Sequence, residues 1–60
     1  MYHEEYISMG RVDLRLQTID VSENECEDLL ADGFQMIQHI RSTGRMILCR
    51  TTLDKLYAIQ

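Results

Sequence analysis

The sequence predicts a small α+β domain in which one acidic helix covers one face of an antiparallel sheet. Three observations support this prediction: a helical segment with marked ends, a run of alternating polar and apolar residues, and two extended runs around a glycine-containing turn. With 60 residues, the chain is expected to form a single domain over positions 1–60. The expected order is β–α–β–β, followed by a short C-terminal helix or strand.

The predicted helix lies in the segment 19–34, IDVSENECEDLLADGF. Ser22 is a typical N-cap residue, and a glutamate three positions later completes the pattern of a capping box. Leu29 and Leu30 share one helical face, so both are expected to dock on the sheet. Gly33 can adopt the left-handed conformation that commonly ends a helix. The segment therefore predicts a helix of about three turns.

The strand before this helix is predicted from strict alternation between Arg11 and Ile19. Such alternation is typical of a half-buried strand. Gly10 interrupts an extension toward the N-terminus, and we interpret it as a kink in one bent strand rather than a turn between two strands. Residues 1–6 are expected to form a lead-in or an edge.

A hairpin is predicted after the helix, with strands over 34–40 and 45–51. Three loop residues ending in Gly44 suit a type I turn closed by a left-handed glycine. This register places Ile40 opposite Met46 and Ile37 opposite Cys49. It also places Arg41 and Arg45 across the tip from each other, where an anionic group would relieve their repulsion.

The same register divides the hairpin into a core face and an outward face. The residues expected in the core are Phe34, Met36, Ile40, Met46 and Leu48. Ile37, Ile47 and Cys49 are then apolar residues on the outward face, where an antiparallel sheet is normally polar. This surplus of apolar residues predicts self-association, most simply as a homodimer.

The C-terminal segment, Thr52–Gln60, has two interpretations. Thr52 can cap a short helix, which we favour. Alternatively, Asp54 and Lys55 form a turn before a fourth strand.

The composition indicates no catalytic, cofactor or metal site. His39 is the only histidine inside a predicted element, and it lacks a neighbouring nucleophile or orienting group. The two cysteines, Cys26 and Cys49, have neither disulfide nor metal spacing, which favours a reducing, cytoplasmic compartment. No signal peptide or membrane-spanning segment is indicated. We therefore expect a non-enzymatic protein.

The charge distribution indicates a protein-binding role. The stretch Asp20–Asp32 contains six acidic residues and no basic one, although the net charge is only -4. In size, acidity and lack of catalytic residues, the chain resembles small proteins, encoded by phages or plasmids, that bind a host enzyme. A viral protein of this kind is therefore expected. We predict a homodimeric regulator or inhibitor of another protein. The expected partner-binding residues are Glu23, Glu27, Asp28, Ile37, Ile47, Arg41 and Arg45.

Two alternatives remain at this point. The first is a regulator that binds nucleic acid through an arginine-rich hairpin, although the pI near 4.9 makes nucleic acid a poor partner. The second is a structural subunit of a larger assembly.

Overall fold

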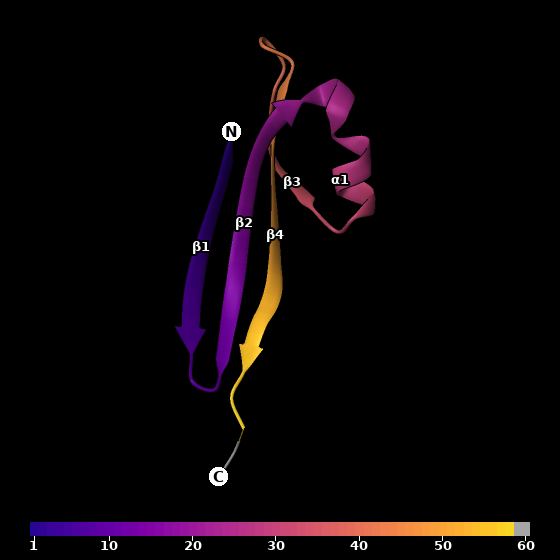
Figure 1. Ribbon diagram of the computed structural model, residues 1–60. Helices are drawn as coiled ribbons and strands as arrows, with labels where there is room; N and C mark the ends of the chain where they lie inside the picture. The colour runs from indigo at the N-terminus through magenta and orange to yellow at the C-terminus, as the bar shows by residue number, and fades with distance from the viewer. Residues whose placement is uncertain (59–60) are drawn as a thin grey trace.

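The computed structural model describes residues 1–58 and shows an elongated, four-stranded antiparallel sheet with the strand order β1-β2-β4-β3 (Figure 1). The strands are β1 (Tyr2–Met9), β2 (Val12–Ser22), β3 (Gln35–Ile40) and β4 (Arg45–Leu56). Between β2 and β3 the chain forms a 3-10 turn, η1 (Glu23–Glu25), and a short α-helix, α1 (Glu27–Ala31). The radius of gyration is 14.2 Å, whereas a compact domain of this length would have about 10 Å.

The predicted α+β fold class is wrong, because strands account for 64% of the described residues and helical residues for only 14%. Ser22 does act as a cap, but its hydroxyl accepts from the Asn24 N–H at 3.3 Å and starts a 3-10 turn. The Glu23 N–H donates to the Gly44 carbonyl at 2.8 Å and ties the start of the segment to the sheet. The α-helix consequently begins only at Glu27 and ends after five residues.

The interpretation of Gly10 as a kink is also wrong. β1 and β2 are separate strands joined by the two-residue turn Gly10-Arg11, with Met9 opposite Val12. Gly10 has a φ of +63°, the positive value that a type II′ hairpin turn requires at its first central position. The glycine therefore reverses the chain instead of bending one strand.

The second hairpin has the predicted strands but a different register. Its loop contains four residues, 41–44, so Ile40 lies opposite Arg45 rather than Met46. Gly44 has the expected positive φ, +68°, but at the fourth position of the loop. A bulge between Met36 and Gln38 shifts the pairing once more.

The predicted C-terminal helix is wrong as well. β4 continues without a turn to Leu56, and Thr52 lies within it, opposite Arg15 of β2. The backbone N–H and C=O groups of this segment form hydrogen bonds with β2. These bonds stabilise a strand more than one capping threonine stabilises a helix. Positions 59 and 60 lie outside the described residues.

The hydrophobic core lies between α1 and the upper half of the sheet, where Figure 1 shows the helix beside β3 and β4. Its buried members are Phe34, Met46 and Leu48, which confirms three of the predicted core residues. Four half-buried residues pack against them: Ile19, Val21, Cys26 and Leu29.

Three other core expectations are not met. Met36 is exposed, Ile40 is half-buried, and Leu30 keeps 43% of its surface exposed. The shifted register turns Ile40 away from the core, whereas Met36 lies opposite the buried Leu48 on the edge strand β3 and keeps 51% of its surface exposed. The short α1 points Leu29, but not Leu30, toward the sheet.

Candidate functional site

The central strand β2 presents its apolar side chains on opposite faces in its two halves. Ile19 and Val21 point to the face that α1 covers, where they pack against the core. Val12, Leu14 and Leu16 are even-numbered, whereas Ile19 and Val21 are odd-numbered. The even-numbered residues therefore point to the opposite face, because side chains alternate along a strand. No second layer covers that face among residues 1–58.

Cross-strand pairing extends this uncovered apolar surface over three strands. Leu14 lies opposite Ile7 on one side and Leu53 on the other, and Val12 lies between Met9 and Leu56. Directly opposite residues share a face. We call this surface the open face, formed by Ile7, Met9, Val12, Leu14, Leu16, Leu53 and Leu56.

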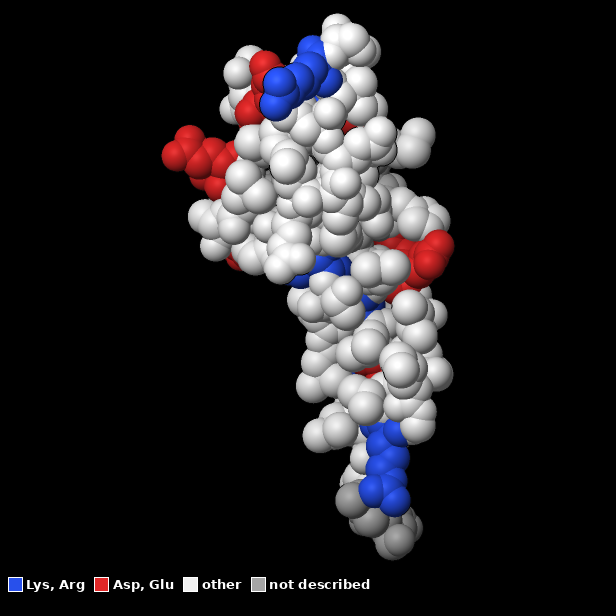
Figure 2. Space-filling view, turned by 180° about the vertical axis from the view of Figure 1, so that it is seen from behind, with Lys and Arg blue, Asp and Glu red and all other residues white. Residues whose placement is uncertain are grey.

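The open face is accessible, and the charged residue that the register places beside it is Glu5, opposite Leu16. Leu53 and Leu56 keep 60% and 68% of their surfaces exposed. Ile47 and Cys49 have the same parity as Leu53 and extend the surface toward the hairpin loop, both half-buried. In the view from behind, the largest charged patches lie at the ends and margins of the molecule, and smaller basic and acidic patches show between uncharged side chains near its middle (Figure 2).

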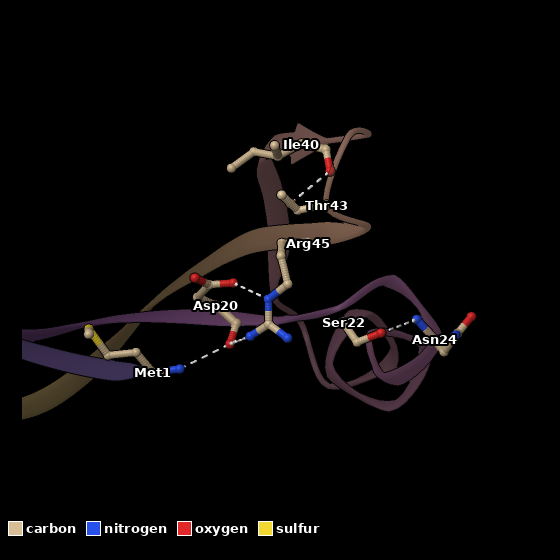
Figure 3. A network of polar contacts seen from close by, with 7 residues as sticks. All are labelled: Met1, Asp20, Ser22, Asn24, Ile40, Thr43 and Arg45. Atoms are coloured by element: carbon tan, nitrogen blue, oxygen red, sulfur yellow. Dashed lines mark hydrogen bonds and ion pairs between the residues drawn. The ribbon is translucent and has the colours of Figure 1, made fainter.

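An ion pair marks the end of this face near the hairpin loop (Figure 3). The Arg45 Nε donates to the Asp20 carboxylate at 3.1 Å, and the same guanidinium donates to the Asp20 carbonyl at 3.1 Å. The amino group of Met1 donates to that carbonyl as well, also at 3.1 Å. Because Arg45 pairs with Ile40 across the loop, the prediction that it faces Arg41 is wrong. Arg41 lies exposed in the loop itself.

The face that carries α1 contains a second anchored arginine. The Arg50 guanidinium donates to the Gln17 side-chain oxygen from two nitrogens, at 3.0 and 2.9 Å. It also donates to the Asp32 carboxylate and carbonyl, both at 2.8 Å. The guanidinium carbon lies 4.4 Å from the centre of the Phe34 ring. Arg45 and Arg50 are thus both paired within the chain.

Tyrosine hydroxyls form hydrogen bonds with two carboxylates on the face that carries α1. Tyr57 donates to Asp13 at 2.6 Å and Ser8 donates to it at 2.8 Å; these two bonds lower the pKa of Asp13. Tyr2 and Tyr6 both donate to Glu4, and these bonds lower the Glu4 pKa in the same way. The carboxylates raise the pKa of Tyr57 and of Tyr6.

The Asp13–Tyr57 bond predicts a stability difference that depends on pH at both extremes. Asp13 has a lowered folded pKa, so its contribution is present above the usual aspartate value of about 3.9 and lost below it. Tyr57 has a raised folded pKa, so its contribution is present below about 10 and lost above it. The urea midpoint of the natural chain should exceed that of Tyr57→Phe by a constant amount from pH 5 to 9, with the gap closing outside this range. A gap independent of pH would contradict the assignment.

The predicted acidic partner-binding residues are exposed. Glu27 and Asp28 lie in the first turn of α1, with no basic residue in its last turn. The Glu23 carboxylate lies 2.9 Å from the His39 imidazole, so it also links the helical segment to β3. Ile37, at the β3 bulge, keeps 58% of its surface exposed.

Neither a metal centre nor a spanning helix is found in the described part of the chain. Within residues 1–58, no three His, Cys, Asp or Glu side chains converge as metal ligands would. No helix there has the length and apolar character needed to cross a bilayer. In comparisons with known proteins, no family model matches the chain, and neither a curated protein nor a solved structure shows significant similarity.

Sequence reasoning missed most of the open face. The sequence interpretation places Ile7 and Met9 in one bent strand with the residues after Gly10, not in a separate strand paired with them. It also favours a helix for the segment that contains Leu53 and Leu56. A signal was nevertheless present in β2, where the apolar positions change from even-numbered residues up to Leu16 to odd-numbered residues from Ile19. Such a change of parity indicates a strand whose two halves are covered on different faces.

Proposed function

We propose that this chain is a non-enzymatic protein-binding module that acts as a homodimer, with its open face packed against that of a second copy. The exposed acidic segment 23–32 then remains outside on each copy, available to a target protein. The open face is the observation on which this proposal rests. A regulator or inhibitor of another protein is the activity that fits this arrangement best.

The exposure of the face supports a dimer. Ile7, Met9, Leu53 and Leu56 keep 41%, 60%, 60% and 68% of their surfaces exposed, so a second copy packed on this face would remove a contiguous apolar surface from water. Among residues 1–58, Phe34, Met46 and Leu48 are the only buried apolar side chains. A domain with so small a core needs additional apolar burial to be stable.

The chemistry of the face favours a second copy as its partner. A surface of aliphatic side chains is complementary to itself, and a twofold axis brings each residue into the interface twice. The charged groups at its margin have partners within the chain: the Glu5 carboxylate, opposite Leu16, lies 2.8 Å from the His3 imidazole, and Asp20 pairs with Arg45 at 3.1 Å. Pairing within the chain reduces the repulsion between these groups when two copies meet.

The dimer is tested by sedimentation equilibrium over the micromolar range. Leu53 is exposed in the single chain, so Leu53→Asp should leave the fold intact and weaken the dimer. Full burial of a leucine contributes about 1.5–3 kcal/mol. Leu53 has 60% of its surface left to bury and twofold symmetry doubles the loss, so dissociation should become at least about tenfold easier. The matched control is Leu30→Asp on the outer side of α1, which should remain dimeric. A natural chain that sediments as a 7.1 kDa species throughout would overturn the proposal.

A further inference from the structure

The sheet has a gap along its β4 edge. β3 contains six residues and β4 contains twelve, and the β3–β4 pairing ends at Gln35 and Cys49. From Arg50 onward, β4 pairs with β2 on one side and has no strand on the other within residues 1–58. The gap begins where β3 begins, so a strand placed there would lie in line with β3 (Figure 1).

The backbone groups that face this gap can be identified from the ladder. The Glu23 N–H donates to the Gly44 carbonyl, which is the next step of the β2–β4 register beyond Ser22 and Arg45. Since bonded and non-bonded pairs alternate in an antiparallel ladder, the even-numbered residues of β4 up to Thr52 bond to β2. The N–H and C=O groups of Thr51 and Leu53 therefore point outward into the gap.

The upper end of the gap is hollowed. A cavity of about 230 Å³ is lined by Gly33, Gln35, Cys49, Arg50 and Thr51. It lies where β3 stops covering β4, and the glycine contributes no side chain to fill it. An incoming strand would thus find unpaired backbone groups at Thr51 and Leu53 and space for a side chain beside them.

The opposite edge of the sheet is less receptive. β1 presents His3, Glu4 and Glu5 in its middle, and charged side chains commonly protect exposed edges against pairing. On β4, the irregularity near Asp54 limits the regular part of the gap to the residues before it. The free β4 edge is therefore short and placed beside a cavity, which suits a single strand rather than open-ended polymerisation.

We propose that the β4 edge between Arg50 and Asp54 binds an extended segment of a partner protein as an additional strand, antiparallel to β4. Such strand addition satisfies the outward backbone groups, which a helix or a lipid surface cannot do in the same way. Thr51 and Leu53 also belong to the apolar side of the sheet, so the segment should carry β-branched or apolar residues opposite them. This inference is independent of the dimer, because the dimer uses the open face and leaves the edge free.

The probe for this edge is a capped octapeptide of alternating threonine and valine, added to 15N-labelled protein while amide hydrogen exchange is followed by NMR. In the free protein, the Thr51 and Leu53 amides should exchange rapidly and the Thr52 amide slowly. The peptide should slow Thr51 and Leu53 at least tenfold and leave Thr52 and the β1 amides unchanged. The matched control is the same peptide N-methylated at its central amides, which cannot complete a ladder and should give no protection.

Three results would overturn the proposal. Equal protection by both peptides would place binding on side chains rather than on the backbone edge. Protection of Thr51 and Leu53 that grows with protein concentration alone would show that a second copy occupies the edge. No protection at millimolar peptide would show that the edge does not accept a strand. Sedimentation of the Leu53→Asp variant tests the dimer separately, so failure of one proposal leaves the other intact.

Discussion

Replacing Leu48 with alanine is expected to be the most damaging substitution in the chain. Leu48 is the only fully buried side chain among the described residues, with 0% of its surface exposed. It lies between Ile19 of β2 and Met36 of β3 at the centre of the small core. Truncation of such a leucine costs about 2–5 kcal/mol through lost transfer energy and the cavity that remains. Because a 60-residue domain has little stability to spare, the variant should be largely unfolded at room temperature.

The measurement is urea unfolding followed by circular dichroism at a fixed protein concentration. Leu30→Ala is the matched control, since the same atoms are removed from a side chain that keeps 43% of its surface exposed. The control should lose less than about 1 kcal/mol, because surface substitutions have small effects. Equal losses in the two variants would show that the core does not lie under Leu48.

Replacing Arg50 with leucine is expected to have the second largest effect. Arg50 satisfies the side-chain oxygen of Gln17, which is itself buried, and holds the loop after α1 through Asp32. Without the guanidinium, the Gln17 oxygen loses both of these bonds, and an unsatisfied buried polar atom costs about 1–3 kcal/mol. The stacking of the guanidinium on Phe34 is lost as well.

Two further substitutions separate charge from geometry at this position. Arg50→Lys keeps the positive charge but loses the planar fork that bonds Gln17 and Asp32 together, so it should retain at least half of the destabilisation. Arg41→Leu removes an exposed arginine from the loop and should change stability by less than about 0.5 kcal/mol. If Arg50→Lys matched the natural chain in urea midpoint, charge alone would explain the role of Arg50.

The features that were predicted correctly are those fixed by local chemistry. Gly33 and Gly44 both have the positive φ expected of them, and Ser22 caps the turn that follows it. The buried positions of Met46 and Leu48 also followed from alternation within one strand. Each of these depends on a few neighbouring residues, so the sequence contains the necessary information.

The features that were missed depend on pairing between distant segments. A capping serine starts a 3-10 turn as readily as an α-helix, and the bond from Glu23 to Gly44 decided between them. The loop has one residue more than predicted, so the cross-strand partner of Ile40 is Arg45 instead of Met46. This change of register alters which side chains reach the core. The apolar residues of the open face were recognisable only once β1 and the end of β4 were known to be strands.

The ladder between β2 and β4 determines how hard this sheet is to form. β1–β2 and β3–β4 are hairpins with loops of two and four residues, so each needs only local contacts. The ladder that joins them runs from the pair Ser22–Arg45, 23 positions apart, to Val12–Leu56, 44 positions apart. Closing loops of this length costs conformational entropy before any contact is gained, which slows folding. The two hairpins are thus the natural early units, and their docking along β2 and β4 is the step that completes the molecule.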